Sequence, residues 1–194
     1  MTKAELRKEF RQKRQLLTEQ DIVIHSQAIA EHLILSALMA SVNTLHVFLP
    51  IQKKKEVDMY EVIHKIKESY PQLKLVASRS NPDTRRLTHY LLTDTTEIVE
   101  NQWGIPEPVP ETAPEIADAA IDAILIPLMA FDLTGNRVGY GMGFYDRFFS
   151  RCRPNVQKIG VSFFEPVPLI SDITSDDVPL TSCITPQEIW HFTH

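Results

Sequence analysis

Two stretches set the architecture of this chain: AAIDAILIP at residues 119–127 and NRVGYGMGFYDR at residues 136–147. The first is an apolar run that predicts a buried strand. In the second, glycines stand at alternate positions, and alternating glycines let consecutive backbone N–H groups face one centre. Such a concavity binds anions, most often phosphate. A helical pattern begins at residue 144. The order is therefore a strand, a glycine loop at residues 139–143, and the start of a helix, which is where α/β proteins place phosphates.

The better-known phosphate motifs do not fit this glycine loop. No Gly-Lys-Ser/Thr sequence follows it, as a P-loop would require. The loop lies too far from the strand for a dinucleotide fingerprint, and no suitable acid follows. On glycine spacing alone, a simple chain reversal remains an alternative. Arg137 before the glycines and Asp146 and Arg147 after them favour a Mg²⁺–nucleotide, whose metal takes hard oxygen ligands.

Length and composition describe one ordinary globular domain spanning residues 1–194. Hydrophobic residues make up 43% of the chain and charged residues 23%, and the net charge is −5. An acidic chain of this kind argues against nucleic-acid binding. Two cysteines give no disulfide framework, and the N-terminus lacks the apolar core of a signal peptide. We therefore expect a cytoplasmic monomer with no membrane or nucleic-acid partner.

The run FDLTGNRVGYGMGFYDR at residues 131–147 closely resembles the signature of the 5-formyltetrahydrofolate cyclo-ligase family, also called 5,10-methenyltetrahydrofolate synthetase. Matching segments extend from Lys3 to Thr185-Pro186, nearly the whole chain. The resemblance implies ATP- and Mg²⁺-dependent cyclisation of 5-formyltetrahydrofolate to 5,10-methenyltetrahydrofolate. Mg²⁺ would be the cofactor, ATP the co-substrate, and small molecules the only partners.

The N-terminal segment carries basic residues at helical spacing, from Lys3 and Arg7 to Arg11 and Arg14. A solvated basic helix face would account for them. The resemblance favours a phosphate role, because Lys3 and Arg7 match a Lys-x-x-x-Arg pattern that reaches the nucleotide phosphates in the family. It implies Asp146 as the Mg²⁺ ligand and Arg137 and Tyr145 as catalytic residues. The implied ATP-binding residues are Lys3, Arg7, Arg137, Gly139, Gly141, Gly143 and Tyr145.

For the folate, the resemblance points to Glu56, which follows the lysine triplet after a predicted strand. A carboxylate can accept two hydrogen bonds from the amino-pyrimidine edge of a pterin. Trp103, in the matching segment WGIPEP, either caps a flat ligand by stacking or anchors its loop on the core. Met142 replaces a glycine common in the family, and we expect activity to survive this change. The full set of expected substrate residues is Leu49, Glu56, Trp103, Tyr140, Met142 and Phe144.

Strands alternate with helices along the chain. This order predicts an α/β fold, a three-layer α/β/α sandwich with a mainly parallel sheet in a single domain. Ligands of such sheets lie beyond the carboxyl ends of the strands. The family commonly has a proline where Ser78 stands, and the acidic loop at 172–177 is expected to be solvated. The expected helices span 2–17, 18–39, 57–69 and 144–151, and the expected strands span 44–50, 73–78, 87–92, 121–127, 158–163 and 182–185.

Two other functions stay open at this stage. One is a folate-binding or storage protein without catalysis, although storage needs neither Lys3 and Arg7 nor Asp146. The other is a paralogous enzyme on the same scaffold, either an isomerase that uses Glu56 as a base or an enzyme that activates another substrate with ATP. Dependence on ATP separates catalysis of the expected kind from storage and isomerisation.

Overall fold

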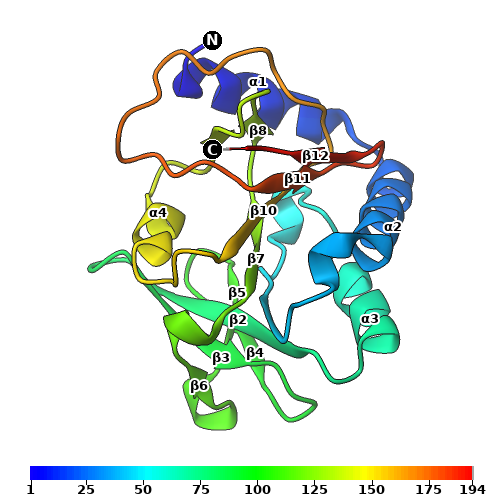
Figure 1. The fold of residues 1–194 in the computed structure, drawn as a ribbon, viewed down its shortest axis with the longest axis vertical. Coiled ribbons are helices and arrows are strands. Elements are labelled where there is room, and N and C mark those ends of the chain that lie inside the picture. Colours follow the sequence, from blue (N-terminus) through cyan, green and yellow to red (C-terminus); the bar gives the residue numbers. More distant parts are fainter. Residues whose placement is uncertain (194) are drawn as a thin grey trace.

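The computed structural model describes residues 1–193 and contains a central sheet of eight strands in the order β12-β11-β10-β7-β1-β2-β3-β6 (Figure 1). The strands from β11 to β2 run parallel to their neighbours, and β12, β3 and β6 add antiparallel edges. The predicted mainly parallel sheet is therefore confirmed. Its strands are β1 (Thr44–His46), β2 (Lys74–Asn81), β3 (Arg86–Leu91), β6 (Glu115–Ile116), β7 (Ala123–Pro127), β10 (Gln157–Val161), β11 (Ser182–Ile184) and β12 (Ile189–His191).

Two small antiparallel pairs lie outside this sheet: β4 (Ile98–Glu100) with β5 (Pro106–Pro108), and β8 (Ala130–Phe131) with β9 (Arg137–Val138). The second pair brings the start of the glycine loop back beside the end of β7. The central strand β1 is shorter than the predicted 44–50. Beyond it, Val47 donates one hydrogen bond to the Val76 carbonyl, 2.8 Å away, and Pro50 has no N–H to donate.

Within residues 1–193, four α-helices flank the sheet: α1 (Lys3–Leu16), α2 (Glu19–Leu35), α3 (Met59–Ser69) and α4 (Phe144–Phe149). Thr2 and Thr18 begin α1 and α2 with capping boxes, as predicted for Thr18. The prediction that the second helix continues to about residue 39 is wrong. Ser36 has an extended backbone, with φ −83° and ψ 153°, and a short 3₁₀ turn over Ala37–Met39 follows it. Helix α4 likewise ends at Phe149, before the predicted residue 151.

The strand β7 shows how the layers form, because its side chains alternate between two cores. Leu125 packs with α2 and α3 on one face of the sheet. Ile124 and Ile126 pack with Phe148 of α4 on the other face. Figure 1 shows α2 and α3 on the opposite side of the sheet from α4, so the predicted three layers are present.

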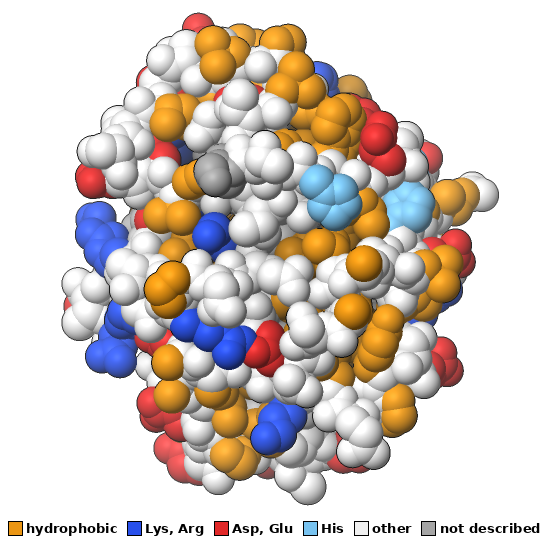
Figure 2. All heavy atoms as spheres, viewed as in Figure 1, with side chains coloured by type: hydrophobic (Ala, Val, Ile, Leu, Met, Phe, Trp, Pro, Cys, Tyr) orange, Lys and Arg blue, Asp and Glu red, His pale blue; other side chains and the backbone are white. Residues whose placement is uncertain are grey.

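The N-terminal helix α1 lies across one end of the sheet, over β8 (Figure 1). Its apolar residues Leu6 and Phe10 pack with Met129 and Val138 in a third, smaller core. This packing leaves Arg7 and Arg14 of α1 free to contact the glycine loop. On the face drawn in Figure 2, acidic and basic side chains are mixed, and the basic ones gather towards the side of α4. None of the helices in residues 1–193 has the length and apolar character needed to span a membrane.

A side chain at Gly160 of β10 would force its neighbours to shift. A Cβ atom there would lie 2.7 Å from Leu128 Cδ2 and 2.9 Å from Cys183 Sγ. We expect Gly160→Ala to lower the free energy of unfolding by about 1–3 kcal/mol, because overpacking forces neighbours to shift. Urea denaturation measures this change. The matched control is Gly139→Ala, where no atom lies within 4 Å, and equal losses in both variants would contradict the packing argument.

Candidate active site

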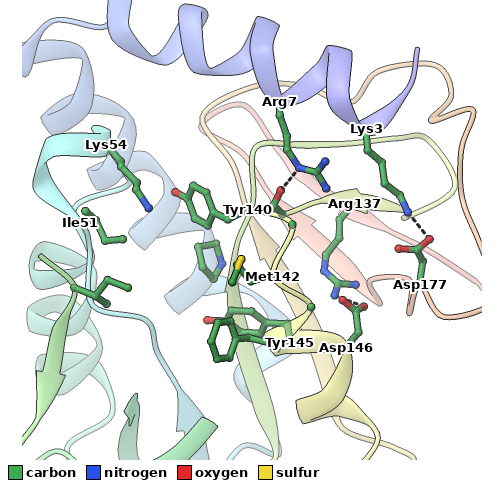
Figure 3. Close-up of a pocket in the computed structure, with 16 residues that line it drawn as sticks. Lys3, Arg7, Ile51, Lys54, Arg137, Tyr140, Met142, Tyr145, Asp146 and Asp177 are labelled. Carbon is green, nitrogen blue, oxygen red and sulfur yellow. Dashed lines mark hydrogen bonds and ion pairs between the residues drawn. The ribbon is translucent and has the colours of Figure 1, made fainter. Parts of the chain in front are cut away.

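The carboxyl ends of β1 and β7 open into a cavity of about 390 Å³ (Figure 3). This is the edge of a parallel sheet at which α/β proteins bind ligands. Segments far apart in the chain meet here: α1, the turn after β1, the glycine loop and the start of α4. The lining residues are Lys3, Arg7, Ile51, Lys54, Ile105, Pro127, Arg137, Gly139, Tyr140, Gly141, Met142, Gly143, Phe144, Tyr145, Asp146 and Asp177.

The glycine loop has a backbone that only glycine adopts without strain. Gly141 and Gly143 have φ values of +92° and +69°, in the left-handed region. A Cβ at Gly141 would also lie 3.3 Å from the Cζ atom of Arg7. The Arg7 Nε donates a hydrogen bond to the Gly139 carbonyl, 2.9 Å away, and so ties α1 to the loop. The alternating glycines therefore make room for a cation beside the backbone.

One half of the cavity is basic, and each of two cations there has an acidic partner (Figure 3). The Lys3 Nζ lies 2.5 Å from Asp177, and the Arg137 guanidinium lies 2.6 Å from Asp146. Arg137 also donates to the Val178 carbonyl, and the Val178 N–H donates to Asp146 over 3.3 Å. Although burial acts against it, hydrogen bonds from Lys3 and Thr174 lower the pKa of Asp177.

The carboxylate of Asp177 is a site residue that the sequence did not reveal. Its loop was expected to be solvated, yet the side chain lines the cavity, as Asp146 does. A single acid in an acidic loop has no spacing that marks it. Only the approach of Lys3, from the other end of the chain, distinguishes it from its neighbours. Lys54 was missed for the same reason, since the lysine triplet was interpreted as ordinary loop.

The other half of the cavity is apolar and aromatic. Ile51, Tyr140, Met142 and Tyr145 line it, and the Lys54 Nζ lies 4.2 Å from the centroid of the Tyr140 ring. Burial raises the pKa of both tyrosines, and the carboxylate of Glu56 raises it further. Both phenols are therefore protonated at neutral pH, and the Tyr140 hydroxyl donates a hydrogen bond. A flat ring fits such walls, because aromatic and thioether groups stack on it.

The structure brings together most of the residues expected to bind substrate, but not all of them. Tyr140, Met142 and Phe144 line the cavity, and Glu56 lies behind Tyr140 and accepts a hydrogen bond from its hydroxyl. Leu49 is buried in the core rather than in the cavity wall. Trp103 is 53% exposed outside the cavity, and Ile105 of the same loop lines it instead. The stacking role of Trp103 stays a prediction.

The carboxylate oxygens of the cavity suit a metal ion that binds together with a nucleotide. Within residues 1–193 no group of three or more potential metal ligands occurs, so a cage made of protein ligands alone is not available. Mg²⁺ is usually bound through one or two carboxylates together with substrate phosphates. Asp146 and Asp177 supply two such carboxylates, and each is paired with a cation. A Mg²⁺–triphosphate carries both signs of charge and could replace both ion pairs at once.

A chain of polar side chains lies against α4, where the rings of His46 and His89 contact Phe148. His46 Nε2 lies 2.6 Å from the Ser78 hydroxyl, which lies 3.2 Å from His89 Nδ1, and His89 Nε2 lies 3.2 Å from Asp118. The ring of His46 also contacts Tyr145, with centroids 6.1 Å apart. Ser78 stands where the family commonly has proline, and here its hydroxyl joins two buried histidines. Neither histidine was singled out in the sequence, because a lone histidine on a strand has no spacing signal.

The buried imidazole of His89 predicts that the stability of the protein depends on pH. Burial, together with Arg151 and Arg86, lowers the pKa of His89 from 6.5 to about 3. A proton then binds more readily to the unfolded chain, so the contribution is fully present above about pH 6.5 and is lost as the pH falls. We expect His89→Gln to flatten the slope of unfolding free energy between about pH 6 and 4 by up to ~1.4 kcal/mol per pH unit. The control is His64→Gln, whose side chain is 66% exposed, and equal slopes in both variants would contradict this account.

Comparison with known proteins assigns the chain to a family. The fold and cavity define an α/β protein with one site that has a basic half and an apolar half. Residues 1–185 match the sequence profile of the 5-formyltetrahydrofolate cyclo-ligase family. The match covers most of the chain, and the chain belongs to this family.

Individual relatives agree with that membership. An Escherichia coli (strain K12) protein named 5-formyltetrahydrofolate cyclo-ligase is 28% identical over 99 residues, so the alignment spans 50% of this chain and about half (54%) of that relative. A Mus musculus protein of the same name is 28% identical over 153 residues, or 76% of this chain and 73% of the relative. The solved 5,10-methenyltetrahydrofolate synthetase of Aquifex aeolicus has a TM-score of 0.79 and 25% identity, covering 100% of this chain and 94% of that one. The Mycoplasma pneumoniae synthetase has a TM-score of 0.73 and 26% identity, covering 95% of this chain and 98% of that one.

Proposed function

We propose that the protein is a ligase that cyclises 5-formyltetrahydrofolate to 5,10-methenyltetrahydrofolate, with ATP as co-substrate, Mg²⁺ as cofactor, and ADP and phosphate as products. The observation that carries this proposal is the division of one cavity into a basic half and an apolar aromatic half. A reaction between a triphosphate and a flat ring system needs both halves side by side. We further propose that the protein acts on these small molecules as a monomer.

The chemistry explains why no covalent nucleophile is needed. An N-formyl group is amide-like, so its carbon is a poor electrophile and its oxygen a poor leaving group. Transfer of the γ-phosphoryl group to the formyl oxygen activates the carbon as an imidate-like centre. N10 of the folate then attacks that carbon, loses its proton to water, and the original formyl oxygen departs within phosphate. The protein therefore has to position two substrates and neutralise charge, as in phosphoryl transfer generally.

On the basic side, we assign the nucleotide phosphates to Lys3, Arg7 and Arg137 and to the backbone of residues 139–145. Arginine offers forked donors and lysine a compact charge, and both suit phosphate oxygens. Asp146, with Asp177 beside it, would hold Mg²⁺. When bound there, the ion supplies charge neutralisation at the phosphate oxygens.

On the apolar side, Tyr140, Met142 and Phe144 would contact the folate, with Glu56 accepting hydrogen bonds from its ring edge. Tyr145, protonated because burial raises its pKa, would donate a hydrogen bond rather than act as a base. The roles proposed for Glu56, Leu49 and Trp103 require further contacts, because none of the three lines the cavity.

The test is the near-ultraviolet absorbance of methenyltetrahydrofolate after mixing the protein with 5-formyltetrahydrofolate and Mg²⁺, with and without ATP. A rise only in the presence of ATP is the expected result. Folate binding without any rise would favour the storage protein. Product formation without ATP would contradict the proposed activation step, and ATP turnover only with another acceptor would favour a paralogous enzyme.

The variant Arg137→Ala tests whether Arg137 stabilises the negative charge on the transferring phosphoryl group. We expect a loss of about 2–4 kcal/mol of transition-state stabilisation, the cost of removing a donor from developing negative charge. The ratio kcat/KM measured at saturating Mg²⁺ gives this value. Arg79→Ala, which removes an exposed arginine outside the cavity, is the matched control. Unchanged turnover in Arg137→Ala would remove Arg137 from the mechanism.

A further inference from the structure

The hydroxyl of Tyr140 is held between two charged side chains from different parts of the fold. It donates a hydrogen bond to Glu56 Oε1 and accepts one from Arg14 Nη1, 3.1 Å away. Because burial and the Glu56 carboxylate raise the pKa of Tyr140, the hydroxyl keeps the proton that it donates. We call this chain of Arg14, Tyr140 and Glu56 the tyrosine bridge.

The buried position of Arg14 on α1 needs an explanation. Its neighbour Arg11 is exposed, whereas Arg14 is only 7% exposed. A buried guanidinium is costly unless its donors are satisfied. Its hydrogen bonds go to the Tyr140 hydroxyl and, over 2.7 Å, to the Leu128 carbonyl, rather than directly to a carboxylate. Arg14 Nη2 thus anchors the side chain to the segment after β7, while Nη1 reaches the glycine loop.

At its other end, the tyrosine bridge fixes the orientation of Glu56. One carboxylate oxygen accepts the Tyr140 hydroxyl, and the other accepts the Ile51 N–H at 2.6 Å. A carboxylate has about four acceptor positions, so the two protein donors leave about two unfilled on Glu56, which is 7% exposed. The two protein donors occupy different oxygens and therefore prevent the carboxylate from rotating.

We propose that Arg14 is a positioning residue that acts through Tyr140 on Glu56. Anchored at Leu128, it holds Tyr140 over the apolar half of the cavity and keeps the Glu56 carboxylate in one orientation. The glycine loop needs such a tether, because Gly139 and Gly141 on either side of Tyr140 give its backbone freedom to move. The consequence for catalysis rests on the proposed function, which assigns Glu56 to the folate ring, but the consequence for the loop does not.

The first experiment is hydrogen exchange of backbone amides 139–143 in the ligand-free protein. We expect Arg14→Met and Tyr140→Phe each to speed exchange there by about tenfold, the factor that corresponds to one lost charge-assisted hydrogen bond. Exchange in β2 and β3 should stay unchanged, which separates a local effect from general destabilisation. Arg11→Met, on the same helix, is the matched control and should exchange like the parent protein.

The double variant Arg14→Met/Tyr140→Phe distinguishes positioning from simple packing. If Arg14 acts through the tyrosine hydroxyl, the double variant exchanges at 139–143 no faster than Tyr140→Phe alone. Additive effects, or unchanged exchange in Arg14→Met, would overturn the proposal. Should Arg14→Met fail to fold, Arg14→Lys replaces it, because a lysine keeps the charge but cannot span both the Leu128 carbonyl and the Tyr140 hydroxyl.

Steady-state kinetics then test the effect on substrate. We expect Arg14→Met to raise KM for 5-formyltetrahydrofolate by about tenfold while KM for ATP changes less than about twofold. An equal rise in both constants would contradict action through Glu56. If the parent protein forms no methenyl product, the proposed function fails, whereas the exchange experiment still decides whether Arg14 positions the loop.

Discussion

The cationic side chains of Lys3, Arg7 and Arg137 lie close to the glycine loop, and the repulsion between their charges has to be offset. Lys3 is paired with Asp177, Arg137 with Asp146, and Arg7 donates to a loop carbonyl. These contacts tie together α1, the acidic segment before β11 and the start of α4, none of which are neighbours in sequence. Without bound phosphate, the carboxylates balance the basic half of the cavity. The same arrangement suits the Mg²⁺–nucleotide that we propose as a ligand.

The apolar half of the cavity has a different origin. Here the sheet decides the geometry, because the turns after β1 and β7 meet at its carboxyl edge. Tyr140 joins the two halves: it belongs to the glycine loop, yet its hydroxyl reaches Glu56 in the turn after β1. A change in the loop therefore affects both halves of the cavity.

Much of this arrangement was predictable from sequence, for identifiable reasons. The apolar run at 119–127 and the alternation of strands and helices gave the parallel sheet, because burial on both faces leaves a pattern. The glycine spacing and the resemblance together located the loop and pointed to Lys3 and Arg7. Asp177, Lys54 and the buried histidines were missed, since their surroundings arise only when distant segments meet. Trp103, predicted to cap the ligand, lies exposed, because the residue of its loop that faces the cavity is Ile105.

The path of the formyl oxygen tests the central claim most directly. If the basic half of the cavity delivers the γ-phosphoryl group to that oxygen, 5-formyltetrahydrofolate labelled with ¹⁸O in the formyl group must yield labelled inorganic phosphate. Mass spectrometry of the phosphate released in unlabelled water would detect it. We predict one ¹⁸O atom in the phosphate for each methenyltetrahydrofolate formed. Unlabelled phosphate, with the isotope recovered in water, would show that the formyl oxygen is never phosphorylated and would contradict the mechanism.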